Sequence, residues 1–276
     1  MQRFKLRTAA ALALCGAFAL PGGAATAQSM QSTSDQWRFN AILYAYLPTI
    51  GGDTHFPAGT GSSISVSTDT ILDNLKFAFM GTFEAQKGKW GFFTDLMYLD
   101  VGGSKSNTRD FSVGGVTVPG GVTADFNLDV KGTIWTIAGT YRVVDDRSSK
   151  LDVFAGARYA DIKEKFGYNL SADIGPIVGP GRSGGNEQKI AVWDGIIGAK
   201  GRLSFGERNE WFVPYYVDVG TGESDLTWQA IGGIGYSFGW GDVMAVWRYL
   251  DYDFGSDKKV ESINFNGPAI GVAFRW

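Results

Sequence analysis

The chain has 276 residues, of which 25 are Lys or Arg and 28 are Asp or Glu, so its net charge at pH 7 is −3. This acidic balance argues against a nucleic-acid-binding protein, which usually carries a basic patch or stripe. The 39 glycines, 8 prolines and 14% aromatic residues are typical of close-packed strands and turns rather than of disorder. The single cysteine, Cys15, lies near the amino terminus, so the fold cannot depend on disulfides or on a thiolate-bound metal.

Residues 1–27 have the pattern of a secretory signal peptide. Basic residues precede an apolar stretch from Thr8 to Leu20, and small residues up to Ala27 suit cleavage by a signal peptidase. The apolar stretch is shorter than the roughly 20 residues that a membrane-spanning helix needs. We therefore expect the mature chain, 28–276, to be one domain that begins with a short polar leader at 28–36.

Segments with a side-chain period of two follow the leader. In the segment 225–239, for example, Leu226, Trp228 and Ile234 fall on one face, whereas Thr227 and Gln229 fall on the other. None of the segments has the 3.6-residue period of a long helix. The pattern predicts ten strands at about 37–48, 77–87, 89–104, 122–144, 149–171, 186–206, 210–224, 225–239, 241–257 and 262–276.

The connections between these segments alternate between short and long. Tight turns follow 87, 144, 206 and 239, whereas 49–76, 105–121 and 172–186 are long and rich in Gly, Ser and Thr. Bacterial barrels have short periplasmic turns and longer external loops. An even strand count returns the carboxyl end to the periplasm; ten strands satisfy this condition, and eight or twelve follow if one hairpin is misread. Within 49–76, the stretch 68–75 predicts a single helical turn capped by Thr70, which either packs against the rim or forms a lid.

The last seven residues, 270–276, alternate large apolar side chains with small or charged ones and end on Trp276. Here the chain resembles the Gram-negative outer-membrane β-barrel proteins, in particular the small OmpA- and OmpW-like barrels, which typically end in such a strand. The resemblance implies a transmembrane, antiparallel, up-and-down all-β barrel in the outer membrane. It also implies contact with outer-membrane lipid, recognition of the carboxyl-terminal strand by the barrel assembly machinery, and a monomer.

Five tryptophans lie at the strand ends that the predicted strand order places on the periplasmic side. Amphipathic rings collect at membrane interfaces, so these residues predict an aromatic girdle, although aromatic residues also favour strands in general. The predicted girdle consists of Trp37, Trp90, Trp211, Trp240 and Trp276.

Charged residues sort onto the opposite, inward face of the strands. Arg or Lys on the lipid face costs about 2–4 kcal/mol near the bilayer midplane, so the sorting has an energetic basis. It also places Lys131 inward and Ile134 outward. The lumen of a ten-stranded barrel is narrow, so the inward charges form either a constriction that passes small solutes or a salt-bridged core that conducts little. The candidate cluster is Asp95, Arg158, Asp194, Lys200, Asp218 and Arg248.

No pattern of catalytic or metal-binding residues stands out. The one histidine, His55, lies in the predicted loop 49–76, and no strand-borne Ser/His/Asp arrangement is recognisable, so we expect neither an enzyme nor a bound cofactor or metal. Acidic residues such as Asp251 and Asp253 and basic residues such as Lys105 and Lys258 lie in or beside the loops. They favour contact with lipopolysaccharide phosphates, directly for the basic residues or through divalent cations for the acidic ones, or are simply solvated. The sequence thus predicts a non-enzymatic narrow pore or structural envelope component, or alternatively an adhesion or ligand-binding barrel that acts through its long loops.

Overall fold

The computed structural model describes residues 36–54, 62–106, 122–174, 177–178, 182–255 and 260–276. The predicted signal peptide, most of the predicted leader and His55 lie outside these ranges. Within them, no helix has the length and apolar character that crossing a membrane would require.

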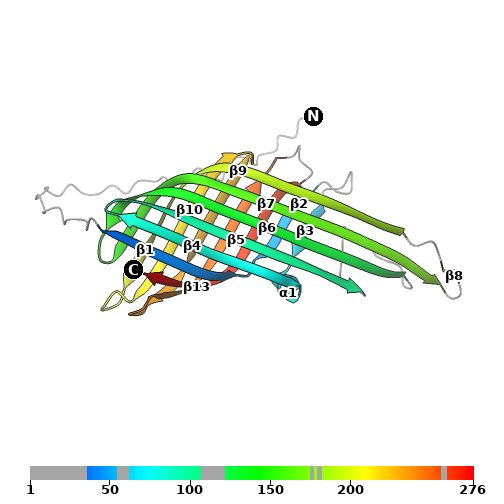
Figure 1. Ribbon diagram of the computed structural model, residues 1–276, viewed down its shortest axis with the longest axis horizontal. Coiled ribbons are helices and arrows are strands. Elements are labelled where there is room, and N and C mark those ends of the chain that lie inside the picture. Colours follow the sequence, from blue (N-terminus) through cyan, green and yellow to red (C-terminus); the bar gives the residue numbers. More distant parts are fainter. Residues whose placement is uncertain (1–35, 55–61, 107–121, 175–176, 179–181, 256–259) are drawn as a thin grey trace, which may run out of the picture. The chain divides into compact units, whose positions relative to one another are not determined.

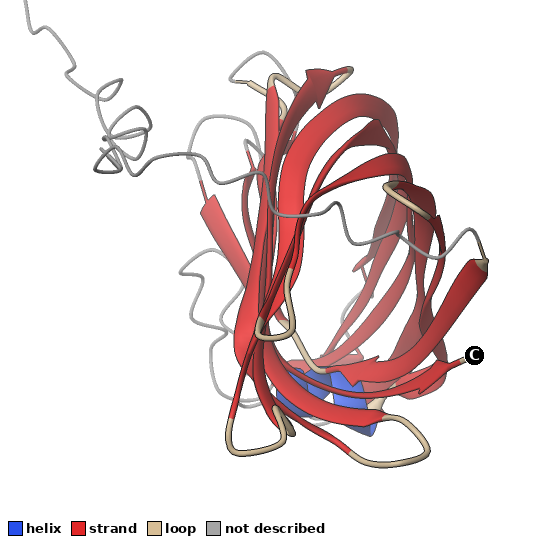
Figure 2. Ribbon diagram, turned by 90° about the vertical axis from the view of Figure 1, so that its left-hand side faces the viewer, coloured by secondary structure: helices blue, strands red, loops and turns tan. Residues whose placement is uncertain are grey.

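Ten antiparallel strands form a closed ring, which confirms the predicted barrel and its strand count (Figures 1 and 2). In ring order the strands are β1 (Trp37–Tyr46), β4 (Leu75–Lys87), β5 (Trp90–Ser106), β6 (Val122–Asp145), β7 (Ser149–Ile174), β9 (Arg182–Phe205), β10 (Trp211–Gly222), β11 (Leu226–Ser237), β12 (Asp242–Asp253) and β13 (Val260–Arg275). The ring closes where β13 pairs with β1, with Ala41 opposite Phe274 and Leu43 opposite Val272.

The two ends of the barrel differ in their connections. At one end, β4 and β5 are joined by Gly88 and Lys89 alone, and Gly88 has a φ of 58°, as the first central position of a type II′ hairpin requires. The turns at 146–148, 206–210 and 238–241 lie at the same end, together with Trp276. We call this end the turn end and the opposite end the loop end.

The predicted loop at 49–76 contains regular structure, so that part of the prediction is wrong. β2 (Thr49–Thr54) continues from β1 along β13, and β3 (Ser62–Val66) pairs with β2. Gly51 and Gly52 interrupt any alternation of apolar side chains, so the sequence carries no strand signal here. The free backbone edge of β13 beyond β1 supplies the hydrogen-bond partners instead.

The predicted helical turn is confirmed as α1 (Thr68–Asp73). It begins two residues before the predicted cap Thr70, and the hydroxyl of Thr68 donates to the carbonyl of Leu47 at 3.3 Å. Ile71 is only 3% exposed, as packing against the rim predicts. α1 precedes the first half of β4, which has no strand partner on its β1 side among the described residues.

Four strands of one wall, β5, β6, β7 and β9, run beyond the others at the loop end (Figure 1), and β5 reaches Ser106, opposite Asp125 of β6. β6, β7 and β9 have 24, 26 and 24 residues, whereas β10, β11 and β12 have 12 each. Twelve additional residues correspond to about 40 Å along a strand. These strands take up much of the segment 172–186 that was predicted as a loop, and β8 (Ile177–Val178) pairs with β7 there.

Side chains alternate between the outer surface and the lumen as predicted on most strands. Leu43, Ile197 and Val217 are 55%, 63% and 52% exposed on the outer face. The predicted faces of Lys131 and Ile134 are wrong, because Ile134 is 4% exposed and packs inside, whereas the Lys131 side chain is 54% exposed. The error arose from expecting a polar lumen throughout.

An apolar cluster fills the lumen toward the loop end. Its members are buried residues of strands on opposite sides of the ring, and Leu250, Tyr252 and Ala160 have no exposed surface. The cluster comprises Tyr46, Met80, Met97, Ile134, Ala160, Ile162, Val192, Leu250, Tyr252, Phe254, Phe265 and Ala269.

Ring closure can be tested by cross-linking, because the only cysteine of the chain is Cys15. Phe39 and Trp276 exchange two backbone hydrogen bonds, so Ile42 and Ala273, three pairs further along, face each other without such bonds. Their Cα atoms should lie about 4.5 Å apart, within disulfide range. We expect Ile42→Cys with Ala273→Cys to form a disulfide under oxidation, seen as a reductant-sensitive shift on a denaturing gel.

The matched control is Ile42→Cys with Ala269→Cys. Ala269 pairs with Tyr46, four residues along the strand, which places it about 13 Å away. This pair should remain as free thiols. Equal cross-linking of both pairs, or of neither, would contradict the β1–β13 register.

Candidate functional site

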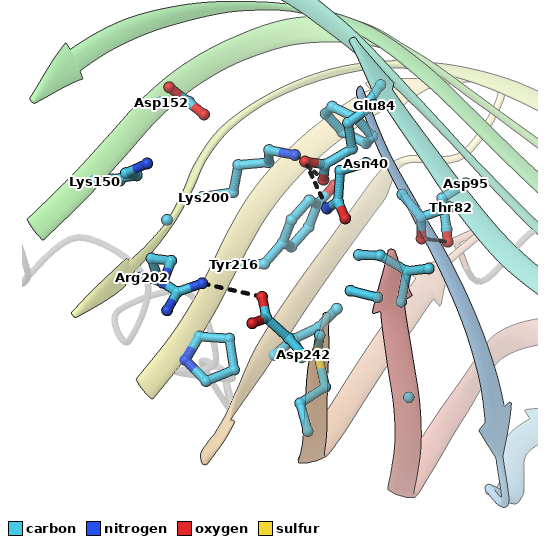
Figure 3. Close-up of a pocket in the computed structure, with 18 of the residues that line it drawn as sticks. Asn40, Thr82, Glu84, Asp95, Lys150, Asp152, Lys200, Arg202, Tyr216 and Asp242 are labelled. Carbon is cyan, nitrogen blue, oxygen red and sulfur yellow. Dashed lines mark hydrogen bonds and ion pairs between the residues drawn. The ribbon is translucent and has the colours of Figure 1, made fainter. Parts of the chain in front are cut away.

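A cavity of about 590 Å³ occupies the lumen at the turn end (Figure 3). Cationic side chains enter it from β7 and β9, where Lys150, Lys200 and Arg202 lie. Glu84 enters from β4, and Asp242 lies at the start of β12. The volume falls in the range of small-molecule sites, about 300–1,000 Å³.

Aromatic rings support two of the cations. The guanidinium carbon of Arg202 lies 3.9 Å from the centre of the Phe212 ring, and the Lys200 ammonium lies 4.6 Å from that of Phe93. Gly235 makes room for Phe212, since a Cβ atom at Gly235 would lie 2.2 Å from the Cζ atom of the ring. These cation–π contacts hold the two charged groups along the cavity wall.

Two carboxylates near the mouth each bind arginine. Asp242 accepts hydrogen bonds from Arg202 Nη1 at 3.1 Å and from Arg275 Nη2 at 2.7 Å, so two cations share one anion. Arg142 makes a bidentate pair with Asp152, with N–O distances of 2.5 and 3.0 Å. Bidentate pairs of this kind fix the orientation of both side chains.

A second shared carboxylate is Asp145, at the end of β6. Arg38 and Lys150 each approach it at 3.9 Å, and Arg142 approaches it at 3.4 Å. The separations of 3.9 Å exceed hydrogen-bonding distance, so these two contacts are electrostatic only. Three cations therefore surround one carboxylate beside the mouth of the cavity.

The cavity lining has an excess of positive charge. It includes seven basic side chains and four acidic ones, a difference of three. The basic residues are Arg38, Arg142, Lys150, Lys200, Arg202, Arg248 and Arg275, and the acidic residues are Glu84, Asp95, Asp152 and Asp242. Apart from Glu84 with Lys200 and Asp95 with Arg248, the charges gather toward the mouth.

Arg248 and its partners close the inner end of the cavity. Its Nη2 donates to Asp95 at 3.1 Å and to Gln229 at 2.7 Å, and its Nη1 donates to the Tyr44 hydroxyl at 2.9 Å. Tyr44 in turn donates to Asp95 at 2.8 Å, as Thr82 does at 2.6 Å. The network joins β12 to β1, β5 and β11, and so spans the lumen.

A second arginine layer lies outside the lining of the cavity. Arg158 pairs with Asp218, and both side chains have no exposed surface. Arg158 also donates to Thr136 at 3.3 Å and to Thr227 at 3.4 Å. Because neither side chain has exposed surface, this ion pair is closed to solvent from both ends of the lumen.

The six residues of the predicted charge cluster do not form one constriction. Four of them form the two buried pairs, Arg248 with Asp95 and Arg158 with Asp218. Lys200 pairs instead with Glu84, and Asp194 accepts a hydrogen bond from the backbone N–H of Ser224 at 2.9 Å. Asp194 therefore holds the connection between β10 and β11.

All five tryptophans of the predicted girdle lie at the turn end and are exposed on the outer surface or at its edge. Their exposed fractions run from 42% for Trp211 to 70% for Trp90, and several stack with neighbours, such as Trp276 on Phe39 at 5.8 Å. A second group of exposed tryptophans lies further from the turns and was not predicted. It consists of Trp135, Trp193, Trp228 and Trp247.

The sequence analysis missed three residues of the cavity, namely Arg142, Lys150 and Asp242. Arg142 and Lys150 flank the turn at 146–148, and Asp242 follows the turn at 238–241, so each resembled solvated turn charge. Their shared inward position could have been found by extending the period-two alternation to the strand ends. Within the described part of the chain, no three His, Cys, Asp or Glu side chains are grouped as a metal site would need.

Comparisons with known proteins support the fold alone. The outer-membrane protease OmpT of Escherichia coli is similar in structure, with a TM-score of 0.51 and 11% identity over 90% of this chain and 99% of that one. The translocator domain of autotransporter NalP from Neisseria meningitidis has a TM-score of 0.38 and 16% identity, covering 87% and 88% of the two chains. Ail, the attachment invasion locus protein of Yersinia pestis, has a TM-score of 0.36 and 11% identity, covering 87% and 98%. No family model and no curated protein sequence matches the chain.

The buried Arg158–Asp218 pair can be tested by unequal replacement. Asp218→Leu leaves Arg158 charged and without its anion in a dry interior, so we expect a loss of about 3–5 kcal/mol in the free energy of unfolding. Arg158→Met combined with Asp218→Leu removes both charges and should recover most of the loss. Urea titration of the protein refolded into lipid vesicles measures both values.

The control is the outer-surface pair Lys189–Asp161, whose lysine side chain is 54% exposed. Asp161→Leu should change the stability by at most about 1 kcal/mol, because water screens the remaining charge. A double variant at 158 and 218 that is no more stable than Asp218→Leu alone would show that the ion pair itself stabilises the barrel.

Proposed function

We propose that the protein is a non-enzymatic component of the outer membrane, with its turn end in the periplasm and its loop end outside, and that its lumen does not conduct. Short turns at one end and long connections at the other support this orientation. Of the two predicted roles, narrow pore and structural envelope component, the arrangement inside the lumen favours the second.

The spacing of the exposed aromatic residues supports a membrane position. On β11 the outward Trp228 and the following Phe238 are ten residues apart, and on β9 Trp193 and Phe205 are twelve apart. Ten residues span about 33 Å along a strand, or about 25 Å along the barrel axis at a tilt of about 40°. This equals the apolar band of about 25 Å that outer-membrane barrels present to lipid.

The observation that carries the proposal is the closure of the lumen at successive levels. The Arg248 network spans it first, the unexposed Arg158–Asp218 pair follows, and apolar residues such as Leu250 fill the remainder. An ion crossing this path would leave water and break paired charges, at a cost of several kcal/mol.

The proposal includes no catalytic role. The inward carboxylates of Asp95, Asp152 and Asp242 each bind an arginine, as structural ion pairs do. The similarity to a protease concerns the fold, and function depends on the residues of a site. We further propose a monomer in contact with outer-membrane lipid and lipopolysaccharide, assembled by the barrel machinery through its carboxyl-terminal strand.

Planar-bilayer recording of the refolded protein tests the closed lumen. The wild-type protein should give no steady single-channel steps, because both arginine layers and the apolar cluster block the path. Removing the bulky groups at each level by Arg248→Ser, Arg158→Ser and Tyr252→Ser together should produce steps. Steady wild-type openings that are altered by Arg248→Ala would instead favour the narrow pore.

The extension of β6, β7 and β9 favours a second candidate, adhesion or ligand binding outside the cell. β9 begins twelve residues, or about 40 Å, beyond Asp194, which pairs with the last residue of β10, and this length would lift the loops well clear of the membrane surface. The backbone pairing is continuous along this extension, from Leu128 opposite Phe166 to Val122 opposite Ala172.

The register permits a clean removal of the extension. Gly103 lies opposite Leu128, and Phe166 lies opposite both Leu128 and Asn186. Residues 104–127 and 167–185 can therefore each be replaced by a short turn, and the remaining strand ends still match. We expect the trimmed barrel to fold and to keep its heat-modifiable mobility on gels. If the protein acts in adhesion, bacteria that display the trimmed barrel should attach to cells less than bacteria that display the wild type. Unchanged attachment would exclude that role for the extension.

A further inference from the structure

The turn-end cavity combines a cationic mouth with an aromatic interior and is closed at its inner end by the Arg248 network. We propose that it binds an amphipathic organic anion from the periplasm, with a carboxylate or phosphate head at the mouth and an apolar or aromatic body in the interior. This inference goes beyond the role of envelope component, and equilibrium binding to the cavity does not depend on whether the lumen conducts.

Charge at the mouth favours an anionic head. Two of the carboxylates there, Asp145 and Asp242, are each shared by more than one cation. A ligand carboxylate or phosphate would add the anion that this arrangement lacks, and it would accept charge-assisted hydrogen bonds from groups already facing it. A cationic ligand would be repelled by the same groups.

Three of the mouth cations remain accessible from solvent. The side chains of Arg38, Lys150 and Arg275 are 42%, 40% and 46% exposed, unlike those of Arg248 and Arg142. Arg38 and Lys150 can turn toward a ligand without breaking a hydrogen bond to Asp145, and if Arg275 turns, Asp242 keeps its hydrogen bond from Arg202. Arg38 and Lys150 contact Asp145 at 3.9 Å, too far for a hydrogen bond, so their N–H donors suit a ligand oxygen.

The interior suits an apolar or aromatic body. Phe93, Phe212 and Tyr216 line it together with aliphatic side chains such as Met244. Burying an apolar group against these walls removes it from water, at a gain of roughly 25 cal/mol per Å². A purely polar anion would forgo this contribution.

The positions of the wall groups are already set. Arg202 lies on Phe212 and donates to Ser237 at 3.0 Å as well as to Asp242, so three contacts hold it without a ligand. Phe93 contacts Phe154 edge-on at 5.2 Å between ring centres, and Phe154 stacks on Tyr216 at 5.1 Å. Because these side chains are already ordered, ligand binding costs them little conformational entropy.

Three naphthalene probes separate the contributions of head and body. Titration calorimetry in non-ionic detergent compares 1-naphthoate, 1-naphthyl phosphate and the neutral 1-naphthamide. We expect the better of the two anions to bind at least about tenfold more tightly than the amide, because only the anions gain charge-assisted hydrogen bonds. The difference between the anions identifies the head group as carboxylate or phosphate.

The variant for this test is Lys150→Gln with Arg275→Gln, which removes two exposed cations of the mouth. It should weaken anion binding by about tenfold or more and leave amide binding unchanged. The matched control, Arg147→Gln with Arg208→Gln, removes two exposed cations of the turns that do not line the cavity. It should bind the anions as the wild type does, with the same detergent background.

Three results would overturn the inference. They are equal affinity for the anions and the amide, unchanged anion binding in the mouth variant, and equal weakening in the turn variant. Heat-modifiable mobility confirms that each variant is folded. Conductance recorded on the same samples is a separate readout, so a conducting lumen would refute the envelope role without affecting the binding result.

Discussion

The pairing of β13 with β1 is the constraint on which the remainder of the structure depends. In hydrocarbon, every backbone N–H and C=O group needs a partner within the protein, and an open sheet edge there would leave a row of them unpaired. Closing ten strands removes both edges over the turn-end half, where Asn40 to Tyr46 pair with β13. Toward the loop end, β2 takes the place of β1 on β13, and α1 precedes the unpaired half of β4.

Ring size then determines what the lumen can hold. A barrel of about eight strands is just wide enough to be filled by side chains, and ten strands leave little more room. At the level of Arg158 and Asp218 the space is filled by an ion pair, and toward the loop end by apolar groups such as Leu250. Among the described residues the turn end keeps a cavity, where Gly235 makes room for the Phe212 ring and side chains such as that of Arg275 are partly exposed.

The alternation of side chains made the fold predictable, and the same rule explains what was missed. Lipid penalises charge on the outer face, so the outward positions of Leu43, Ile197 and Val217 could be assigned from the sequence. The lumen has no equivalent rule, since a narrow interior accepts apolar side chains or paired charges equally well. Ile134 was therefore assigned to the wrong face, and β2 and β3 escaped notice because their pairing is set by the exposed edge of β13. Which charges pair also depends on strands distant in sequence, as with Arg248 and Asp95, and no local pattern encodes that distance.

The cationic wall and the loop-end extension are carried by the same strands. Arg142 lies on β6, Lys150 on β7 and Lys200 on β9, and these three strands run beyond the ring together with β5. The backbone register between β6 and β7 runs from Val122 opposite Ala172 to Asp145 opposite Lys150 with one irregularity, near Arg142. The two ends are joined directly by this hydrogen-bonded wall. Because strands in register cannot slide without breaking their ladder, moving one of these strands along its axis would break backbone hydrogen bonds to its neighbours.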